Sequence, residues 1–213
     1  MTTARDLAIV ALGVTPDRPL EQGDLSLALA GAEVFDLIEA KALVVDGDRI
    51  LPSAQAPTGD RLLDEATAAL VRQEPYESVE DWLWRRGRGL SSAYVDELER
   101  EGLTKRPRGL RSPLRGGRTE PVESAAPRRA EERWAEDEPV LVALAAAAGI
   151  RDEPTEEEPA EDAPELAEEA PELAGDAVTA VLAAVGSAVQ ELQAVRQRKA
   201  IEDAAFDNIW RGY

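Results

Sequence analysis

Arginines gather at one point of the chain in a pattern that suits anion binding. Three of them fall within four positions, just ahead of a serine pair at which we expect a helix to begin: Arg85, Arg86 and Arg88. Guanidinium groups beside the free amides of a helix N-terminus can hold a phosphate or a carboxylate. The alternative is a solvated basic loop that pairs with Glu77 or Glu80. This segment therefore predicts either an anion site or an ion-paired loop.

A second basic segment follows within twenty residues, and it is free of acids. It contains six bases between positions 105 and 118, namely Lys105, Arg106, Arg108, Arg111, Arg115 and Arg118, with Leu110 and Leu114 among them. Near an anionic membrane each base contributes roughly 1 kcal/mol of attraction, so this strip predicts contact with a phospholipid surface. The alternative is a solvated loop, or a loop that pairs with the acidic arm, residues 151–176, whose 12 acids and one base give a charge of −11.

Several chemistries are excluded by the residue types that are missing. The 213 residues contain no histidine and no cysteine, which removes serine–histidine and cysteine–histidine triads, thiolate nucleophiles and the common zinc sites. The 43 acidic residues leave a paired-carboxylate mechanism formally open, but abundance alone indicates no site. We therefore predict a protein that is not an enzyme and has no catalytic residue, metal or cofactor.

The elements that would position these arginines are mostly helices. A helix is expected over 24–41, capped by Asp24, with apolar residues on one face and Glu33, Asp36 and Glu39 on the other. Asp46-Gly47 between short apolar runs predicts a type I′ hairpin. Further helices are expected after Asp60, after the capping box of Ser78 and Asp81, from Ser91 or Ser92 to Gly102, over 131–149, and from Asp176. The tryptophans at 82, 84 and 134 are expected to pack in the core or between helices.

The predicted fold class is mainly α. A compact helical domain over 1–150 would carry one or two β-hairpins, one of them the basic hairpin or loop at 105–118. An acidic, disordered, low-complexity linker over 151–175 would follow, because glutamate, proline and alanine cannot bury enough apolar surface to fold. A C-terminal helix and aromatic tail would occupy 176–213. Neither a signal peptide nor a membrane span is expected, so membrane contact would be peripheral.

Five stretches together resemble the Golgi phosphoprotein 3 family. In chain order they are 27–43 (LALAGAEVFDLIEAKAL), 56–67 (APTGDRLLDEAT), 74–84 (EPYESVEDWLW), 98–104 (LEREGLT) and 133–149, which begins Arg-Trp. The resemblance covers roughly residues 4–150, and the arginine- and alanine-rich style is similar to that of a bacterial, actinobacterial-type member. It implies a helical fold with a protruding hairpin, in a non-enzymatic peripheral adaptor that binds phosphatidylinositol 4-phosphate.

The resemblance also identifies the family's headgroup pocket, which in eukaryotic members holds a tryptophan and three arginines. The matching positions here are Glu21 for the tryptophan, then Ala30, Arg88 and Ser91 for the arginines. Only Arg88 is kept, and Glu21 would repel a phosphate. The expectation is therefore a cytoplasmic protein on the inner membrane face that binds anionic lipid with little headgroup preference.

Two other classes of function remain open on the sequence. Helix, turn, helix and basic hairpin over 91–118 also describe a winged-helix nucleic-acid binder. Against it, the helix that would enter the groove carries Asp96, Glu97, Glu99 and Glu101. The third reading is a scaffold that recruits proteins, a second copy included, through the acidic arm and the final helix.

Overall fold

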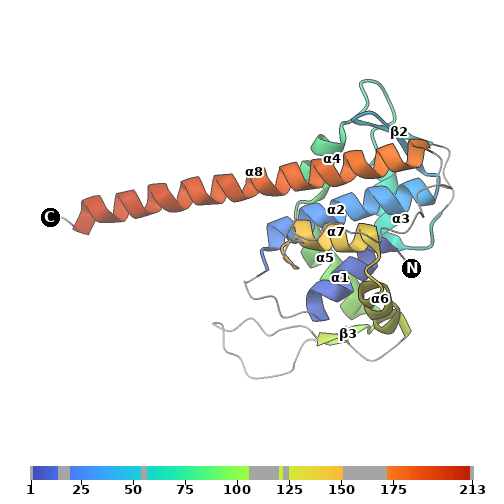
Figure 1. Cartoon of the computed structure of the whole chain (residues 1–213), viewed down its shortest axis with the longest axis horizontal. Helices are drawn as coiled ribbons and strands as arrows, with labels where there is room; N and C mark the ends of the chain where they lie inside the picture. Colours follow the sequence, from blue (N-terminus) through green and yellow to red (C-terminus); the bar gives the residue numbers. More distant parts are fainter. Residues whose placement is uncertain are drawn as a thin grey trace, which may run out of the picture.

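A computed structural model describes residues 2–13, 20–53, 57–105, 120–121, 125–150 and 172–211 of the chain (Figure 1). Helices dominate, as predicted: α1 (Thr3–Gly13), α2 (Gln22–Glu39), α3 (Arg61–Ala68), α4 (Val79–Arg86), α5 (Leu90–Arg100), α6 (Ala125–Ala135), α7 (Pro139–Ala147) and α8 (Glu172–Arg211). The mainly helical fold class, with a two-stranded hairpin and a long C-terminal helix, is confirmed. The segment predicted to be disordered, 151–175, lies outside the described residues except for its last four.

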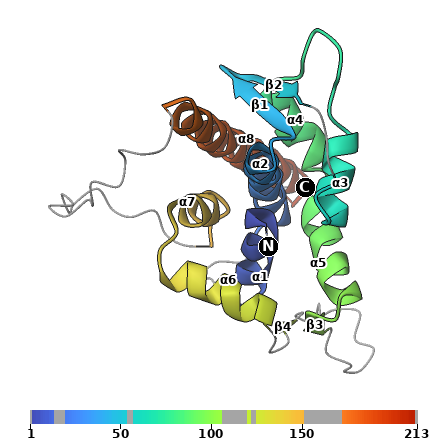
Figure 2. The same cartoon turned by 90° about the vertical axis from the view of Figure 1, so that its right-hand side faces the viewer.

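Helix α2 forms the centre of the fold, and 14 of its 18 residues are buried. Helices α1, α3, α4, α5, α7 and α8 pack around it from different sides (Figure 2). Helix α8 crosses α2 at Gly31, where a Cβ atom would lie only 2.4 Å from Val185 Cγ2. The absence of a side chain at Gly31 is what lets the two helices approach so closely.

Of the polar face predicted for α2, Glu39 is exposed to solvent, but Glu33 and Asp36 are not. Glu33 is 0% and Asp36 5% exposed, and Asp24, predicted as the N-cap, is buried within the first turn behind Glu21. Each of the three carboxylates meets a partner inside the protein: Glu33 accepts from Arg86, Asp36 from the first amides of α1, and Asp24 pairs with Arg196. The prediction was wrong for Glu33 and Asp36 because helices cover α2 on every side.

The hairpin between α2 and α3 is present. Strands β1 (Leu43–Asp46) and β2 (Arg49–Pro52) pair antiparallel, with Asp46 opposite Arg49. Gly47 and Asp48 form the turn, and of the two only Gly47 has a positive φ, of 60°. This is the pattern of a type II′ turn, in which only the first central residue needs a positive φ, and not of the predicted type I′.

Local capping signals set the starts of two helices, as predicted. The Asp60 carboxylate accepts the amides of Leu62 and Leu63 at 2.9 and 3.1 Å and starts α3. Ser78 Oγ accepts the amide of Asp81 at 3.0 Å and donates to its carboxylate at 2.7 Å, which starts α4. Helix α5 ends before Gly102, whose φ is 72°.

The helix predicted over 131–149 is two helices. Helix α6 ends at Ala135, Asp137 takes a φ of 52°, and Pro139 occupies the first turn of α7 behind Glu138, whose carboxylate accepts the amide of Leu141 at 2.8 Å. Proline favours a helix start and disfavours an interior position, so the chain restarts here.

Helix α8 begins at Glu172 rather than at Asp176, and its two halves differ in environment. In the first half Val181 and Val185 are fully buried and Val189 is 4% exposed. The second half extends away from the rest of the molecule as a single rod (Figure 1). By length and composition, Gly175–Asp203 could cross a membrane, with a mean hydropathy of 1.4. A core helix passes the same test, and here the buried valines pack against α2, so length and composition are weak evidence for a span.

Candidate anion pocket at the turn between α4 and α5

The arginine cluster lies at a tight turn between two helices. Helix α4 ends at Arg86. A Cβ atom at Gly87 would lie 2.6 Å from the carbonyl oxygen of Leu83, one turn back in α4, and 3.3 Å from that of Ser26 on α2. Gly89 takes a φ of 72° and precedes the first residue of α5. The two glycines hold the turn against α2 and leave Arg88, the residue between them, exposed.

The structure does not bring the three predicted arginines together. Arg85 Nε donates to Glu77 at 2.6 Å, and its guanidinium lies 5.1 Å from the centre of the Trp82 ring. The ion-paired alternative to an anion site therefore holds for Arg85. Arg86 turns inward, where it donates to both Glu33 oxygens at 2.7 and 2.8 Å and to the Leu62 carbonyl at 3.0 Å.

Arg88 differs from its neighbours, because no ion pair or hydrogen bond links its side chain to any other residue that the structure describes. It lines a pocket of about 250 Å³. The walls come from the first two turns of α2, the turn itself, the start of α5 and Leu192 of α8. Trp84 and Leu27 supply apolar wall, and Arg88 alone is charged among the described residues of the lining.

The start of α5 contributes less to this pocket than its sequence suggests. Ser91 does not cap the helix: its amide donates to Ser26 Oγ at 3.0 Å, and the Ser26 hydroxyl donates back to Ser91 Oγ at 3.0 Å. The Leu90 amide donates to the Gly87 carbonyl at 3.2 Å. Of the first three amides of α5, only that of Ser92 has no acceptor among the described residues, and Ser92 also lines the pocket. An anion here would meet one guanidinium and one free amide.

An acidic neighbour lies on the other side of the α2 N-terminus. A second pocket, of about 370 Å³, is lined by Glu21, Asp24, Gly149 and Arg196 among others. Arg196 of α8 lies 2.8 Å from the Asp24 carboxylate and 3.9 Å from that of Glu21. The second pocket therefore suits a cation, and the guanidinium of Arg196 already fills that role. An anion would bind in the Arg88 pocket instead.

The positions matched to the family pocket are separated by the fold. Arg88 and Ser91 line the pocket near Arg88, and Glu21 is exposed just before α2. Ala30 is fully buried, and its carbonyl oxygen accepts the indole Nε1–H of Trp82 at 3.2 Å. Trp84 packs against the core, as expected, and it also lines the pocket. Its helical position supplied the signal, since it lies about 200° around α4 from the buried Trp82.

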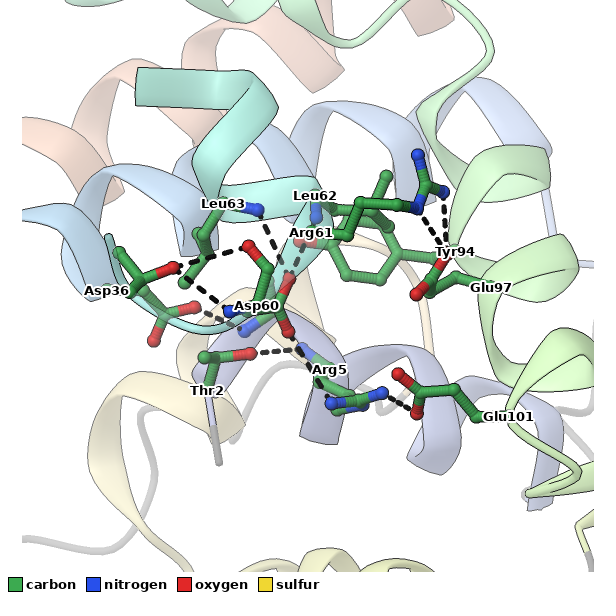
Figure 3. A network of polar contacts seen from close by, with 12 residues as sticks. Thr2, Arg5, Asp36, Asp60, Arg61, Leu62, Leu63, Tyr94, Glu97 and Glu101 are labelled. Carbon is green, nitrogen blue, oxygen red and sulfur yellow. Dashed lines mark hydrogen bonds and ion pairs between the residues drawn. The ribbon is translucent and has the colours of Figure 1, made fainter. Parts of the chain in front are cut away.

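A network of buried and half-buried ion pairs holds α5 against the rest of the domain (Figure 3). Arg61 of α3 donates to Glu97 of α5 at 2.6 and 2.8 Å, and Arg5 of α1 pairs with Asp60 at 3.5 Å and with Glu101. The acids predicted to face a nucleic-acid backbone are thus partly used in intramolecular pairs. This network joins α1, α3 and α5, and none of its residues lines the Arg88 pocket.

Glu33 and Asp36 of α2 are buried acids with raised pKa values, and both are structural. Burial raises the pKa of Glu33, against the opposing hydrogen bonds from Arg86 and from the Tyr94 hydroxyl at 3.2 Å. Burial also raises the pKa of Asp36 to about 7, although it accepts the amides of Ala4 and Thr3 at 3.0 and 2.6 Å. Both carboxyls are enclosed by protein, so neither can meet a substrate. Within the described ranges no group of three acids is placed to hold a metal ion.

The second basic segment can be located only by its ends. Strand β3 (Thr104–Lys105) pairs antiparallel with β4 (Glu120–Pro121), Lys105 opposite Glu120, so the strip leaves and rejoins the domain at one two-stranded base. Its remaining predicted site residues, Arg106, Arg108, Arg111, Arg115 and Arg118, lie outside the described residues.

Comparison with known proteins bears on almost the whole chain. A protein-family model described as Golgi phosphoprotein 3 (GPP34) matches residues 4–192. No curated protein matches the chain. The matched region includes α1 to α7 and the packed half of α8, and it ends at Leu192, the last residue of the Arg88 pocket.

Proposed function

We propose that this chain, which belongs to the Golgi phosphoprotein 3 family, is a peripheral membrane protein that binds anionic phospholipid headgroups in the Arg88 pocket. The family is of a non-enzymatic adaptor type, and the proposal assigns no catalytic residue, metal or cofactor to this chain. Its place would be the cytoplasmic face of a membrane.

The observation that carries the proposal is the contrast between Arg88 and its two neighbours. Arg85 and Arg86 are satisfied by carboxylates, whereas Arg88 faces a pocket with apolar walls and no acid among its described lining residues. A guanidinium and a free amide at the mouth of such a pocket suit a phosphate oxygen. At about 250 Å³ the pocket lies below the usual range for drug-sized ligands, so it would accept a headgroup and leave the acyl chains in the membrane.

The charge count determines which headgroup is expected. One guanidinium balances one negative charge, and no second cation stands among the described residues of the lining to balance another. The ligand of this proposal is therefore a phosphodiester with a single charge, such as that of phosphatidylglycerol. Phosphatidylinositol 4-phosphate, whose monoester adds further charge, would gain little over it. The basic strip at 105–118 would add attraction to the membrane that does not distinguish headgroups.

Liposome co-sedimentation tests the Arg88 pocket. Arg88→Ala should lower the affinity for phosphatidylglycerol vesicles about tenfold, the effect expected for one hydrogen-bonded charge pair, and should leave binding to neutral phosphatidylcholine unchanged. Arg128→Ala is the matched control, because it removes one exposed arginine from α6, away from the pocket. Equal weakening by the two variants would show that only overall charge matters and would refute the pocket.

Nucleic-acid binding is less well supported by the surroundings of α5. Tyr94 and Leu98 are buried against the domain, and Glu97 pairs with Arg61, so α5 is a core helix with an acidic outer face. A helix of this kind has no basic surface to present to a phosphate backbone. A shift assay with random duplex, run beside the liposomes, would overturn the lipid proposal if the duplex bound more tightly.

A further inference from the structure

The outer half of α8 is a long helix that extends beyond the domain (Figure 1). From Gln197 to Asp203 every residue is exposed, and the apolar side chains of Val195, Ile201 and Phe206 are 51%, 69% and 63% exposed. The family match ends at residue 192, so this half lies beyond the shared domain. A helix that leaves its domain with apolar side chains exposed is only marginally stable by itself in water.

One regular seam runs along both halves of α8. The residues of this seam are spaced alternately three and four positions apart. In the packed half they are Val178, Val181, Val185, Ala188 and Leu192. The same alternation continues with Val195, next to the Arg196 that pairs with Asp24, and then beyond the domain with Lys199, Glu202 and Phe206. Spacing of this kind, averaging 3.5 residues, is the repeat by which two helices pack side by side. The outer half therefore carries a helix-packing face, and two charged residues stand in its middle.

We infer that this face pairs with the same face of a second copy of the chain, antiparallel, about a two-fold axis between Ala200 and Ile201. That axis brings Val195 opposite Phe206 of the second copy, and Lys199 opposite Glu202 of the second copy. Symmetry repeats both pairs on the other side of the axis. All four seam positions then meet a complementary residue: apolar against apolar, and cation against carboxylate.

The charges select this partner over others. In a parallel pair Lys199 would face Lys199, and Glu202 would face Glu202, which is unfavourable in the middle of a seam. On an anionic membrane, Glu202 and the neighbouring Asp203 would be repelled by the lipid phosphates. Self-complementarity is what identifies a second copy rather than an unrelated helix.

The contact is small, and this sets the expected affinity. Residues 195–206 span about 17 Å of helix, so the overlap is little more than three turns. Interfaces that hold at nanomolar concentration generally bury at least about 1,200 Å², more than two short helices can supply. The dimer should therefore form at tens of micromolar or above, or where chains are concentrated on a surface.

Charge reversal in the full-length chain tests the seam. By sedimentation equilibrium, Lys199→Glu should raise the dissociation constant of the dimer at least tenfold, since a carboxylate at position 199 would then face Glu202, and Glu202→Lys should do the same. The double variant Lys199→Glu/Glu202→Lys should restore the wild-type constant, and a mixture of the two single variants should form heterodimers. Gln190→Glu is the control, since it changes the charge of an exposed position on α8 away from the seam.

The direction of pairing has a separate test, because the chain contains no cysteine. A Val195→Cys chain mixed with a Phe206→Cys chain should cross-link with a short bis-maleimide, and Val195→Cys alone should not, because the two copies of position 195 would lie about 16 Å apart. A wild-type chain that stays monomeric up to millimolar concentration overturns the inference. So does a Lys199→Glu chain that dimerises like the wild type with unchanged helix content by circular dichroism, or preferential cross-linking of Val195→Cys to itself.

Discussion

Replacing Arg86 with methionine would leave a fully buried carboxylate without its cation. Glu33 is 0% exposed, and two of its hydrogen bonds come from Arg86, at 2.7 and 2.8 Å. The Tyr94 hydroxyl, at 3.2 Å, would remain as a donor to Glu33. Methionine keeps most of the length of the arginine stem, so the substitution tests the charge rather than the volume.

The expected loss of stability follows from how buried pairs behave. Removing one partner of such a pair costs about 3–5 kcal/mol, because the other charge stays buried and uncompensated. For a chain of this size that corresponds to a melting temperature lower by roughly 10 °C. Glu33→Gln in the same chain removes the uncompensated charge and keeps an acceptor for Tyr94. The double variant should therefore recover at least about 2 kcal/mol of the loss.

The pH dependence gives a second, independent signature. Burial holds the pKa of Glu33 above its ordinary value, and loss of the Arg86 cation raises it further. A raised pKa in the folded state contributes stability below the pKa of the unfolded chain, and that contribution disappears as pH rises through the folded value. The deficit of Arg86→Met should thus shrink as pH falls towards about 4.5 and grow towards neutrality.

Urea unfolding followed by tryptophan fluorescence, at about pH 4.5 and about pH 7.5, measures both signatures for the wild type, the two single variants and the double variant. An Arg86→Met chain within about 1 kcal/mol of the wild type at the higher pH would show that Glu33 is not isolated as described. A double variant no more stable than Arg86→Met would show that the loss comes from packing and not from an uncompensated charge.

Three further expectations can be measured in the same way. Burial raises the pKa of Asp36 to about 7, so the free energy of unfolding should fall as pH rises from about 4 to 7. Asp36→Asn should make this fall smaller by about 1–4 kcal/mol, measured by urea titrations at the two pH values. Gly31→Ala should destabilise the chain by about 1–3 kcal/mol, because the added methyl group forces Val185 and α8 away from α2. Gly186→Ala should stabilise the chain slightly, because nothing lies within 4 Å of the added Cβ atom. If the two variants had the same melting temperature, the close crossing of α2 and α8 would be contradicted. Triple replacement of Arg108, Arg111 and Arg115 by alanine should weaken binding to anionic liposomes and flatten its dependence on salt, and wild-type protein that ignores such liposomes at low salt would refute any role for the strip.

The features that sequence predicted well are those decided by neighbouring residues. Asp60 and Ser78 cap their helices because the amides they accept lie two or three residues ahead. Gly47 makes its turn because it alone can readily adopt the required φ. The break before Pro139 was equally local and could have been predicted, but the apolar residues on either side suggested one continuous helix.

The features that sequence missed depend on packing between distant segments. Glu33 and Asp36 looked solvent-facing because helical periodicity cannot reveal that six helices surround α2. The same limit applies to the site. The sequence offered Glu77 as a partner for this cluster, and Arg85 takes it, but it gave no sign that Arg86 turns inward to Glu33, 53 residues away, and leaves Arg88 apart from the other two.

The crossing of α8 over α2 at Gly31 also sets an order of events during synthesis. Val181 and Val185 cover the centre of α2, but they leave the ribosome about 150 residues after it. At a synthesis rate of roughly 5–20 residues per second, the apolar surface around Gly31 stays uncovered in the nascent chain for about 8–30 s. The last helix to be made is thus the one that completes the core. A ribosome-bound chain that stops before residue 176 should be a substrate for holdase chaperones, whereas the full chain after release should not.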